Sequence, residues 1–273
     1  MHALLNVAIS AARKGGDSLV RSQRRLHELN IESKGRNDFV SEADRRAEEK
    51  IIDEIRKNYP EHAILAEESG ASPGKDVEWI IDPLDGTNNF LHSFPVYCVS
   101  VAARIDGRLS HGVIYDPVSQ EMFTASRGDG AQLDGRKMRV SGRRQLSEAL
   151  VGTGFPYRGD QQAGVDHYLA LLKAVLTKSA GIRRPGAAAL DLAYVAAGRL
   201  DAFWEFGLKP WDVAAGALII REAGGIISGI DGGENYLDSG HVMAGTPKVF
   251  AALARLFATD AKAAIDALSG LQK

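Results

Sequence analysis

Five acidic residues stand where apolar segments of this sequence begin or end: Glu67, Glu68, Asp82, Asp85 and Asp212. Taken singly, each has an ordinary structural explanation, such as a helix N-terminus for Asp212 or a turn for Asp85. Carboxylates at such places are costly to desolvate unless they are paired or bind a cation. Because no His or Cys stands among them, the set suits a hard cation such as Mg²⁺ or Mn²⁺ better than zinc.

The segment after Asp85 can supply an anion site. Gly86 allows the backbone to approach a ligand closely. A predicted helical turn begins at Thr87 or Asn88 and runs to Phe90, and the N–H groups at its start can hold a phosphate. Carboxylates that gather metals beside such amides are typical of a metal-dependent phosphatase, in which paired metals lie about 3.5–4 Å apart.

Motifs of other catalytic mechanisms are absent from the sequence. It has no G-x-S-x-G, no G-x-x-x-x-G-K-[ST], no H-E-x-x-H, and no G-x-G-x-x-G after a predicted strand. The segment GTGF at 152–155 follows a strand but lacks the third glycine of a dinucleotide site. The seven histidines are scattered, and His92 is expected to be a loop residue.

Helical spacing predicts the elements that support these residues. An amphipathic helix is expected within 1–29, and a second helix begins after Ser41, which forms a capping-box pattern with Asp44, and ends before Pro60. Further helices are predicted over 160–177, within 181–198 and over 210–225, with Gly224 ending the last of these and one or two more helices closing the chain.

Alternating and apolar segments predict the strands, which cover 62–68, 77–82, 96–105, 112–117, 121–126, 149–155, 199–207 and 241–247. The strands between 96 and 138 form an antiparallel meander, whereas strands and helices alternate later, so we expect two sheets layered between helices. We expect an α+β half over 1–145 that holds most metal ligands, and an α/β half over 146–273 that holds the substrate-facing residues and Asp212.

Composition narrows the classes of protein. At 273 residues the chain is long enough to bury a sizeable core. Its net charge of -2 argues against a nucleic-acid or membrane partner recruited by bulk charge. Cys98 is the only cysteine, which excludes an intrachain disulfide and fits a reducing cytoplasm. No apolar segment is long enough to span a membrane, and the N-terminal charges follow the apolar residues, unlike those of a signal peptide.

Three segments carry a family resemblance: AEES at 66–69, WIIDPLDGTNNF at 79–90 and PWDVAAGALIIREAGG at 210–225. In their order and separation they resemble the inositol monophosphatase family, most closely its bacterial SuhB-type members, over nearly the whole chain. The resemblance implies the layered αβαβα sandwich of the inositol monophosphatase and fructose-1,6-bisphosphatase type. It also implies Mg²⁺-dependent, lithium-sensitive hydrolysis of a phosphate monoester such as inositol 1-phosphate.

The resemblance implies roles for individual residues. Two Mg²⁺ ions, or Mn²⁺ in their place, are implied on Glu67, Asp82, the Leu84 carbonyl, Asp85 and Asp212, with a third, weaker ion near Glu67. Glu67 and Thr87 would orient the attacking water, with Asp44 behind Thr87, although Asp44 fits the capping box equally well. The implied substrate-binding residues are Asp85, Gly86, Thr87, Arg183, Gly186, Ala187, Ala188, Glu205 and Asp212.

Two positions depart from the family pattern. Asn88 replaces the second threonine of the common DGTTNF, while Thr87 is kept, so activity is expected to survive. Ala187 stands where relatives have the hydroxyl residue of GTAA or GSAA, which removes a substrate contact but leaves the backbone contacts.

Several functions remain open from the sequence. Other small-molecule phosphates are alternative substrates, namely fructose 1,6-bisphosphate, histidinol phosphate and a 3′-phosphoadenosine nucleotide. Glu205 favours a polyol, because a carboxylate accepts hydrogen bonds from hydroxyls and repels a second phosphate. The resemblance also implies a homodimer and a role in transcription antitermination with RNA polymerase and Nus factors, with basic segments 21–25 or 136–144 as contacts. Such charged segments are more often a solvated surface.

Overall fold

The computed structural model describes residues 3–35, 38–156 and 164–260. The helices are α1 (Ala3–Gln23), α2 (Glu42–Asn58), α3 (Thr87–Leu91), α4 (Val165–Leu176), α5 (Ala188–Ala196), α6 (Pro210–Glu222), α7 (Tyr236–Ser239) and α8 (Pro247–Asp260). The strands are β1 (Ile31–Gly35), β2 (Asp38–Ser41), β3 (His62–Ala66), β4 (Gly70–Ser72), β5 (Lys75–Asp85), β6 (Cys98–Ile105), β7 (Arg108–Asp116), β8 (Glu121–Ser126), β9 (Gly130–Leu133), β10 (Arg136–Lys137), β11 (Leu150–Thr153), β12 (Gly181–Arg183), β13 (Ala202–Glu205), β14 (Ile226–Gly229) and β15 (Val242–Gly245).

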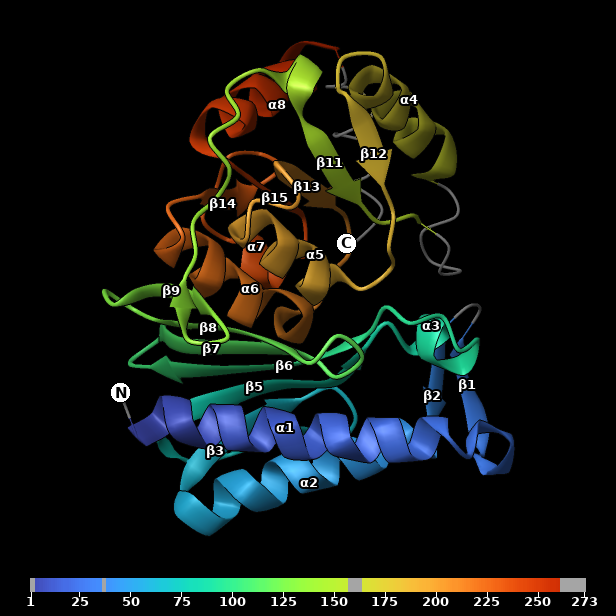
Figure 1. Ribbon diagram of the computed structural model, residues 1–273, viewed down its shortest axis with the longest axis vertical. Coiled ribbons are helices and arrows are strands. Elements are labelled where there is room, and N and C mark those ends of the chain that lie inside the picture. The colour runs from blue at the N-terminus through green and yellow to red at the C-terminus, as the bar shows by residue number, and fades with distance from the viewer. Residues whose placement is uncertain (1–2, 36–37, 157–163, 261–273) are drawn as a thin grey trace.

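Two sheets alternate with three layers of helices. From bottom to top, Figure 1 shows α1 and α2, an eight-stranded sheet, the α5–α7 layer, a five-stranded sheet, and then α4 and α8. The larger sheet has the order β10-β9-β8-β7-β6-β5-β3-β4, and the smaller one β12-β11-β13-β15-β14. This arrangement confirms the predicted αβαβα sandwich and the antiparallel meander from β6 to β9.

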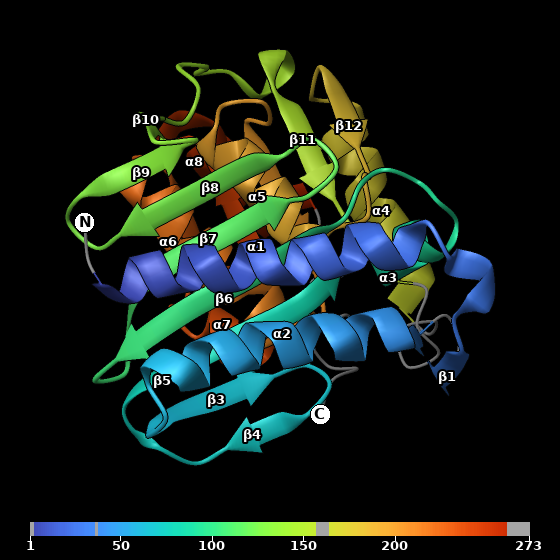
Figure 2. The same cartoon turned by 60° about the horizontal axis from the view of Figure 1, so that its bottom comes forward.

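Buried apolar side chains join the layers. Figure 2 shows α1 and α2 lying across the larger sheet, where Leu19, Ile51 and Trp79 are fully buried. On the far side of the molecule, Trp204 and Phe257 belong to the core between the smaller sheet and the helices α4 and α8. Each such side chain contributes roughly 1.5–3 kcal/mol of hydrophobic stabilisation. Both sheets are therefore held between well-packed helices.

The middle layer is thin because its helices are rich in alanine and glycine. A Cβ added to Gly112 of β7 would lie 2.9 Å from the carbonyl oxygen of Ala215 in α6, and one added to Gly216 would lie 2.6 Å from Leu192 Cβ in α5. One core cluster accordingly includes residues of both sheets and of α5 and α6. This core contains residues from both sides of the predicted division between residues 145 and 146. The division into two halves stays a prediction.

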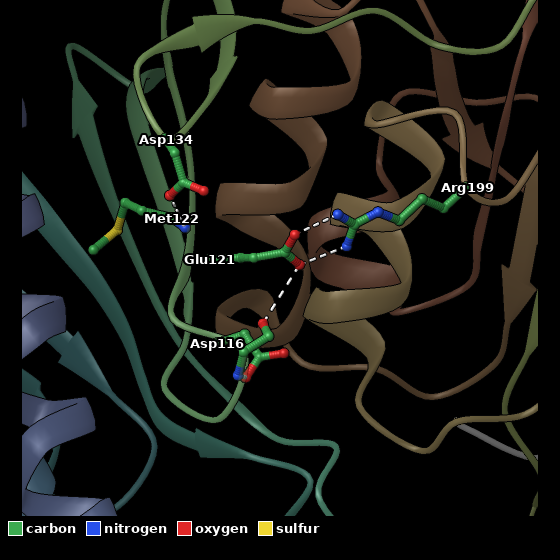
Figure 3. A network of polar contacts seen from close by, with 6 residues as sticks. Asp116, Glu121, Met122, Asp134 and Arg199 are labelled. Atoms are coloured by element: carbon green, nitrogen blue, oxygen red, sulfur yellow. Dashed lines mark hydrogen bonds and ion pairs between the residues drawn. The ribbon is translucent and has the colours of Figure 1, made fainter.

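Polar contacts also tie α5 to the larger sheet. Figure 3 shows Arg199, just after α5, paired through both guanidinium Nη atoms with Glu121 at the start of β8. Around the same hairpin, Asp134 Oδ1 accepts a hydrogen bond from Met122 N at 3.0 Å, and Asp116 Oδ1 accepts one from Val118 N at 2.8 Å. These contacts order the β7–β8 turn, which lies at the same edge of the sheet as the end of β5.

Most predicted elements are present, and the differences concern short strands. Strands β1, β2, β4, β9, β10, β12 and β14 were not predicted, because each has only two to five residues. Strand β5 continues past Asp82 to Asp85, with an irregularity in its pairing to β6 between these two residues. No helix in residues 3–35, 38–156 and 164–260 has the length and apolar character needed to cross a membrane.

Candidate active site

The irregularity at the end of β5 aims two carboxylates at one place. Asp82 pairs with Ser100 and Asp85 with Cys98, so β5 holds one more residue than β6 between these pairs, which is a β-bulge. Residues three apart on a regular strand point to opposite faces, and the additional residue brings them back to the same side. Pro83 fits this position because it has no N–H to pair.

Asp82 is the most deeply buried acid of the group, with a relative exposure of 1%. Burial raises its pKa well above the usual range, and the charges of Glu67, Asp85 and Asp212 raise it further. Its Oδ1 accepts a hydrogen bond from Leu84 N at 2.9 Å. The structure thus gathers four acidic residues from three separate elements, as expected from the sequence.

Asp85 links the bulge to the middle helices. Its Oδ2 accepts a hydrogen bond from Ala189 N at 2.7 Å, at the start of α5, where Ala187 is the N-cap and offers no side-chain bond. The Cys98 thiol donates to the same oxygen at 3.7 Å. Asp85 therefore caps α5 in place of a hydroxyl at Ala187. Burial and then the charge of Asp212 raise the pKa of Asp85 to about 7.

Behind the bulge, the half-buried Thr87 lies against the buried Asp44. The Thr87 hydroxyl lies 3.2 Å from Asp44 Oδ1 and 3.1 Å from the Leu84 carbonyl oxygen. The other oxygen of Asp44 accepts bonds from Ser41 N at 2.8 Å and Ser41 Oγ at 2.6 Å, which confirms the predicted capping box of α2. One fully buried carboxylate thus serves the helix and contacts Thr87, so the two explanations of Asp44 are compatible.

Gly86 is required by its own surroundings. Its φ of 93° is left-handed, and an added Cβ would lie 2.9 Å from the Val96 carbonyl oxygen and 3.3 Å from Ala187 Cβ. Gly86 thus lies close to other parts of the chain, while its predicted approach to a ligand stays a prediction. The glycine allows the turn before α3 to lie against Ala187, the N-cap residue of α5.

Glu205 and Asp212 lie on the opposite side of the site from α2. Glu205 ends β13, and its Oε1 would lie 1.8 Å from a Cβ on Gly154, so the glycines of GTGF make room for side chains rather than for a dinucleotide. Asp212, in the first turn of α6, accepts a bond from Lys209 N at 2.7 Å and raises the pKa of both Asp82 and Asp85. It is thus both a helix-terminal residue and a member of the acidic group.

Of two neighbouring arginines, the structure places the second toward the acids. Arg183 is exposed, and its Nη1 donates to the Ile182 carbonyl oxygen at 3.0 Å. Arg184 is partly buried, with its guanidinium carbon 5.3 Å from the centre of the Phe155 ring. Burial lowers the pKa of Arg184, and the charges of Glu205, Asp191 and Asp85 oppose that shift. Arg184 is thus the arginine near Glu205 and Asp85, whereas Arg183, the residue that the resemblance implies, is exposed.

Asn89 is a connecting residue that sequence reasoning missed. Its Nδ2 lies 2.7 Å from the Val96 carbonyl oxygen and 2.9 Å from that of Pro185. It joins α3 to the loop before α5, across 96 residues of chain. Its neighbour Asn88, the departure from the family motif, is exposed. The comparison with the family motif draws attention to Asn88, whereas Asn89 makes the hydrogen bonds that connect α3 to the loop before α5.

Asp191 is a second buried acid that the sequence did not single out. It lies on α5 with a relative exposure of 1%, and its Oδ1 has no hydrogen-bond partner within the described ranges. Burial, followed by the charges of Glu205 and Asp85, raises its pKa well above the usual range. The folded protein therefore holds the proton of Asp191 to higher pH than the unfolded chain does.

Asp191→Asn is expected to stabilise the protein at neutral pH. The unfolded chain ionises this residue near 3.8, while the folded protein keeps it protonated to higher pH. Its contribution to the free energy of unfolding therefore falls as the pH rises above that value. Asn removes this loss, so the variant should unfold about 2–4 °C higher for each kcal/mol gained. Thermal unfolding from acidic to neutral pH measures the difference, with exposed Asp53→Asn as control; a constant difference at every pH contradicts the explanation.

The donor set fits a hard divalent cation. It consists of carboxylates and a backbone carbonyl, without nitrogen, and its buried like charges make a cation favourable. Within the described residues, no three Asp, Glu, His or Cys side chains already stand in a metal-binding arrangement. Three of the aspartates instead each direct one oxygen to a nearby backbone N–H. Metal binding would require these side chains to turn toward a shared ion.

Comparisons with known proteins agree with this geometry. The model of the Inositol monophosphatase family matches residues 1–262. The Nus factor SuhB of Pseudomonas aeruginosa is 52% identical over 257 residues, covering 93% of this chain and 95% of that protein.

Solved structures give the same result. The extragenic suppressor protein suhB from Bartonella henselae superposes with a TM-score of 0.92 at 44% identity, covering 94% of this chain and 99% of that one. The inositol monophosphatase from Anabaena (Nostoc) has a TM-score of 0.83 at 36% identity, covering 94% and 96%. Fold, motif order and sequence identity agree over nearly the whole length, and the chain belongs to the inositol monophosphatase family.

Proposed function

We propose that this protein hydrolyses phosphate monoesters with Mg²⁺, and that its preferred substrate is a small phosphorylated polyol such as inositol 1-phosphate. The observation that carries the proposal is the buried Asp82, whose pKa is raised by burial and by three neighbouring carboxylates. Such a group is stable as an anion only beside a cation. Membership of a phosphatase family supports the same conclusion.

The residues fit two ions. Glu67, Asp82 and the Leu84 carbonyl would hold one, and Asp82, Asp85 and Asp212 the second, with a third, weaker ion near Glu67. When bound, Mg²⁺ neutralises charge on the phosphoryl group and lowers the pKa of a coordinated water. Mn²⁺ should replace it, because it accepts the same oxygen ligands.

The chain itself orients the nucleophile and the phosphate. Asp44 accepts the Thr87 hydroxyl hydrogen, so the oxygen lone pairs of Thr87 are directed at the attacking water. Glu67 accepts a proton from that water. The N–H groups of Gly86 and Thr87 face the phosphate oxygens. Phosphoryl transfer requires mainly such in-line positioning and charge neutralisation, so no covalent phosphoenzyme is needed.

The remaining residues would form hydrogen bonds with the hydroxyl groups of the substrate. Asp85, Asp212 and Glu205 supply acceptors, and the backbone of Gly186, Ala187 and Ala188 supplies further contacts. The structure suggests Arg184 rather than Arg183 as the donor, since only Arg184 is partly buried near Glu205 and Asp85. A carboxylate and a guanidinium together match a polyol, whose hydroxyls both donate and accept.

Arg184→Ala is expected to raise KM for inositol 1-phosphate about tenfold and to leave kcat within about threefold, because a lost hydrogen bond to a charged group costs roughly 1.5–3 kcal/mol. Arg183→Ala is the matched control, since it removes an exposed guanidinium from the adjacent position. Steady-state kinetics on both variants measure the effect. Equal KM values for the two variants would remove Arg184 from the substrate site.

A substrate comparison tests the proposed function. kcat/KM with Mg²⁺ should be highest for inositol 1-phosphate among inositol 1-phosphate, fructose 1,6-bisphosphate, histidinol phosphate and a 3′-phosphoadenosine nucleotide. A preference for the bisphosphate would reject the polyol assignment and keep the phosphatase. Lithium inhibition and a homodimer in sedimentation equilibrium are expected with the same preparation.

Transcription antitermination is a second candidate function, and one feature favours it. The P. aeruginosa relative carries the name Nus factor SuhB. In this chain, a groove of about 760 Å³ lies between the end of α1 and the start of α2. Its lining includes five cationic side chains and one acidic one: Arg21, Arg24, Arg25, Arg46, Lys50 and Glu49. Although the whole chain has a net charge of -2, the groove is therefore a local positively charged surface, which suits an anionic surface on a partner.

In the other basic segment, 136–144, two of the arginines make contacts within the chain. There Arg139 donates to the Glu222 carbonyl oxygen at 2.8 Å and Arg143 lies 3.5 Å from Asp201. We therefore expect RNA polymerase with Nus factors to contact the groove of Arg21–Arg25. The paired change Arg21→Glu and Arg25→Glu should weaken that binding about tenfold or more and leave hydrolysis unchanged.

Asp85→Asn should do the reverse, abolishing hydrolysis without loss of binding. Arg136→Glu is the control for charge reversal on the other exposed segment. Pull-down with purified RNA polymerase and Nus factors, beside a phosphatase assay, separates the two functions. If the groove variant binds as the unchanged protein does, the groove is not the contact.

A further inference from the structure

Glu48 is a buried carboxylate with no role in the reaction described above. It lies on α2, one helical turn after Asp44, with a relative exposure of 4%. Its Oε2 accepts a hydrogen bond from Glu68 N at 2.9 Å, and its Oε1 accepts one from Ser69 N at 2.8 Å. Both oxygens of one buried side chain are thus directed at two successive backbone amides.

These amides belong to the turn that carries Glu67. Residues 67–69 connect β3 to β4, which pair up to Ala66 and Gly70. At the start of this turn, Glu67 N donates to the Ile81 carbonyl oxygen at 3.2 Å, next to Asp82. The turn is therefore attached to β5 on one side and to α2 through Glu48 on the other.

Helix α2 supports both catalytic turns from one face. Residues four apart on a helix are neighbours, and Asp44 contacts Thr87 while Glu48 contacts the turn after Glu67. A displacement of about 1 Å in a supporting element is enough to weaken a metal site. Helix α2 thus holds both turns from one side, in addition to the pairing of β3 with β5 that ends beside them.

We propose that Glu48 is a positioning residue that fixes Glu67 relative to Asp82 and so determines the metal affinity of the site. The inference rests on the proposed function, because Glu67 and Asp82 are ligands only in a metal-dependent phosphatase. A merely structural Glu48 would affect stability alone. The two explanations differ in what they predict for metal binding by the folded protein.

The test is direct Mn²⁺ binding to the full chain by isothermal titration calorimetry, which needs no substrate. Glu48→Gln keeps the shape but replaces one acceptor oxygen by an NH₂ group that faces a backbone N–H. We expect its Kd for Mn²⁺ to rise about tenfold or more, the usual effect of losing a partner behind a ligand. Asp53→Asn, the same loss of a carboxylate on an exposed residue of the same helix, should bind as the unchanged protein does.

Thermal unfolding and a second variant complete the experiment. Glu48→Asp keeps both oxygens on a shorter side chain, is measured if Glu48→Gln does not fold, and should show an intermediate Kd. A Glu48 variant that unfolds earlier but binds Mn²⁺ with unchanged affinity overturns the inference and leaves the proposed function intact. If the unchanged protein binds no Mn²⁺, the proposed function fails, and the inference with it.

Discussion

Asp82→Asn is expected to lower kcat/KM for phosphate ester hydrolysis by at least about 10³-fold, close to 4 kcal/mol of transition-state stabilisation. Asp82 is the one side chain implied for both metals, so no other single change removes as much of the site.

The same substitution should not destabilise the metal-free protein. Burial and neighbouring carboxylates raise the pKa of Asp82, and Asn removes that repulsion while its oxygen still accepts from Leu84 N. We expect the metal-free Tm to stay equal or rise, and the increase in Tm on adding Mg²⁺ to shrink, because ligand binding stabilises only the state that binds.

Asp76→Asn is the matched control for this experiment. It makes the same change on an exposed residue of the same strand, where the φ of 62° suits asparagine. Activity and Tm, each with and without Mg²⁺, measure the effect. An Asp82→Asn protein that keeps most of its activity, or that loses Tm only without Mg²⁺, would contradict the assignment of Asp82 as a shared ligand.

Local patterns predicted much of this site. The capping box of Ser41 and Asp44, the helix that opens with Pro210, and the acids before Gly86 all depend on residues a few positions apart. The meander was predicted for the same reason, since its strands are sequential and joined by short turns.

Contacts between distant segments were not predictable. Asp85 caps α5 across 104 residues, and Asn89 reaches the loop before α5 across 96. The sequence singles out Asp85 but neither its partner nor Asn89, because a hydrogen bond between distant segments leaves no periodic pattern. Glu48 was missed likewise, as its acceptors face a turn twenty residues later.

The exchange of Arg183 for Arg184 has a related cause. β12 ends at Arg183, so which of the two arginines faces the acids depends on where the strand ends and the chain turns toward α5. β12 has three residues and pairs with β11 through Leu150, Val151 and Gly152, so its register depends on the fold of the sheet rather than on its own sequence.

Thr87→Val is expected to lower kcat about 100-fold and to change KM for substrate little, because in the proposed mechanism the hydroxyl acts on the attacking water rather than on the bound ester. Valine keeps the volume but removes the group that lies 3.2 Å from Asp44 Oδ1 and 3.1 Å from the Leu84 carbonyl oxygen. Asp44 keeps its two bonds from Ser41, so the fold should survive with a Tm lower by a few °C.

Thr87→Ser separates chemistry from packing in this experiment. Serine restores the hydroxyl without the methyl group, so kcat should return to within about tenfold of the unchanged protein if orientation of water is the role of Thr87. Asp44→Asn should resemble Thr87→Val, because an amide in place of the carboxylate no longer ensures that the Thr87 hydrogen is accepted. If valine and serine are equally slow while all three variants keep their Tm, Thr87 acts through packing of the turn before α3, and the water must be oriented by Glu67 alone.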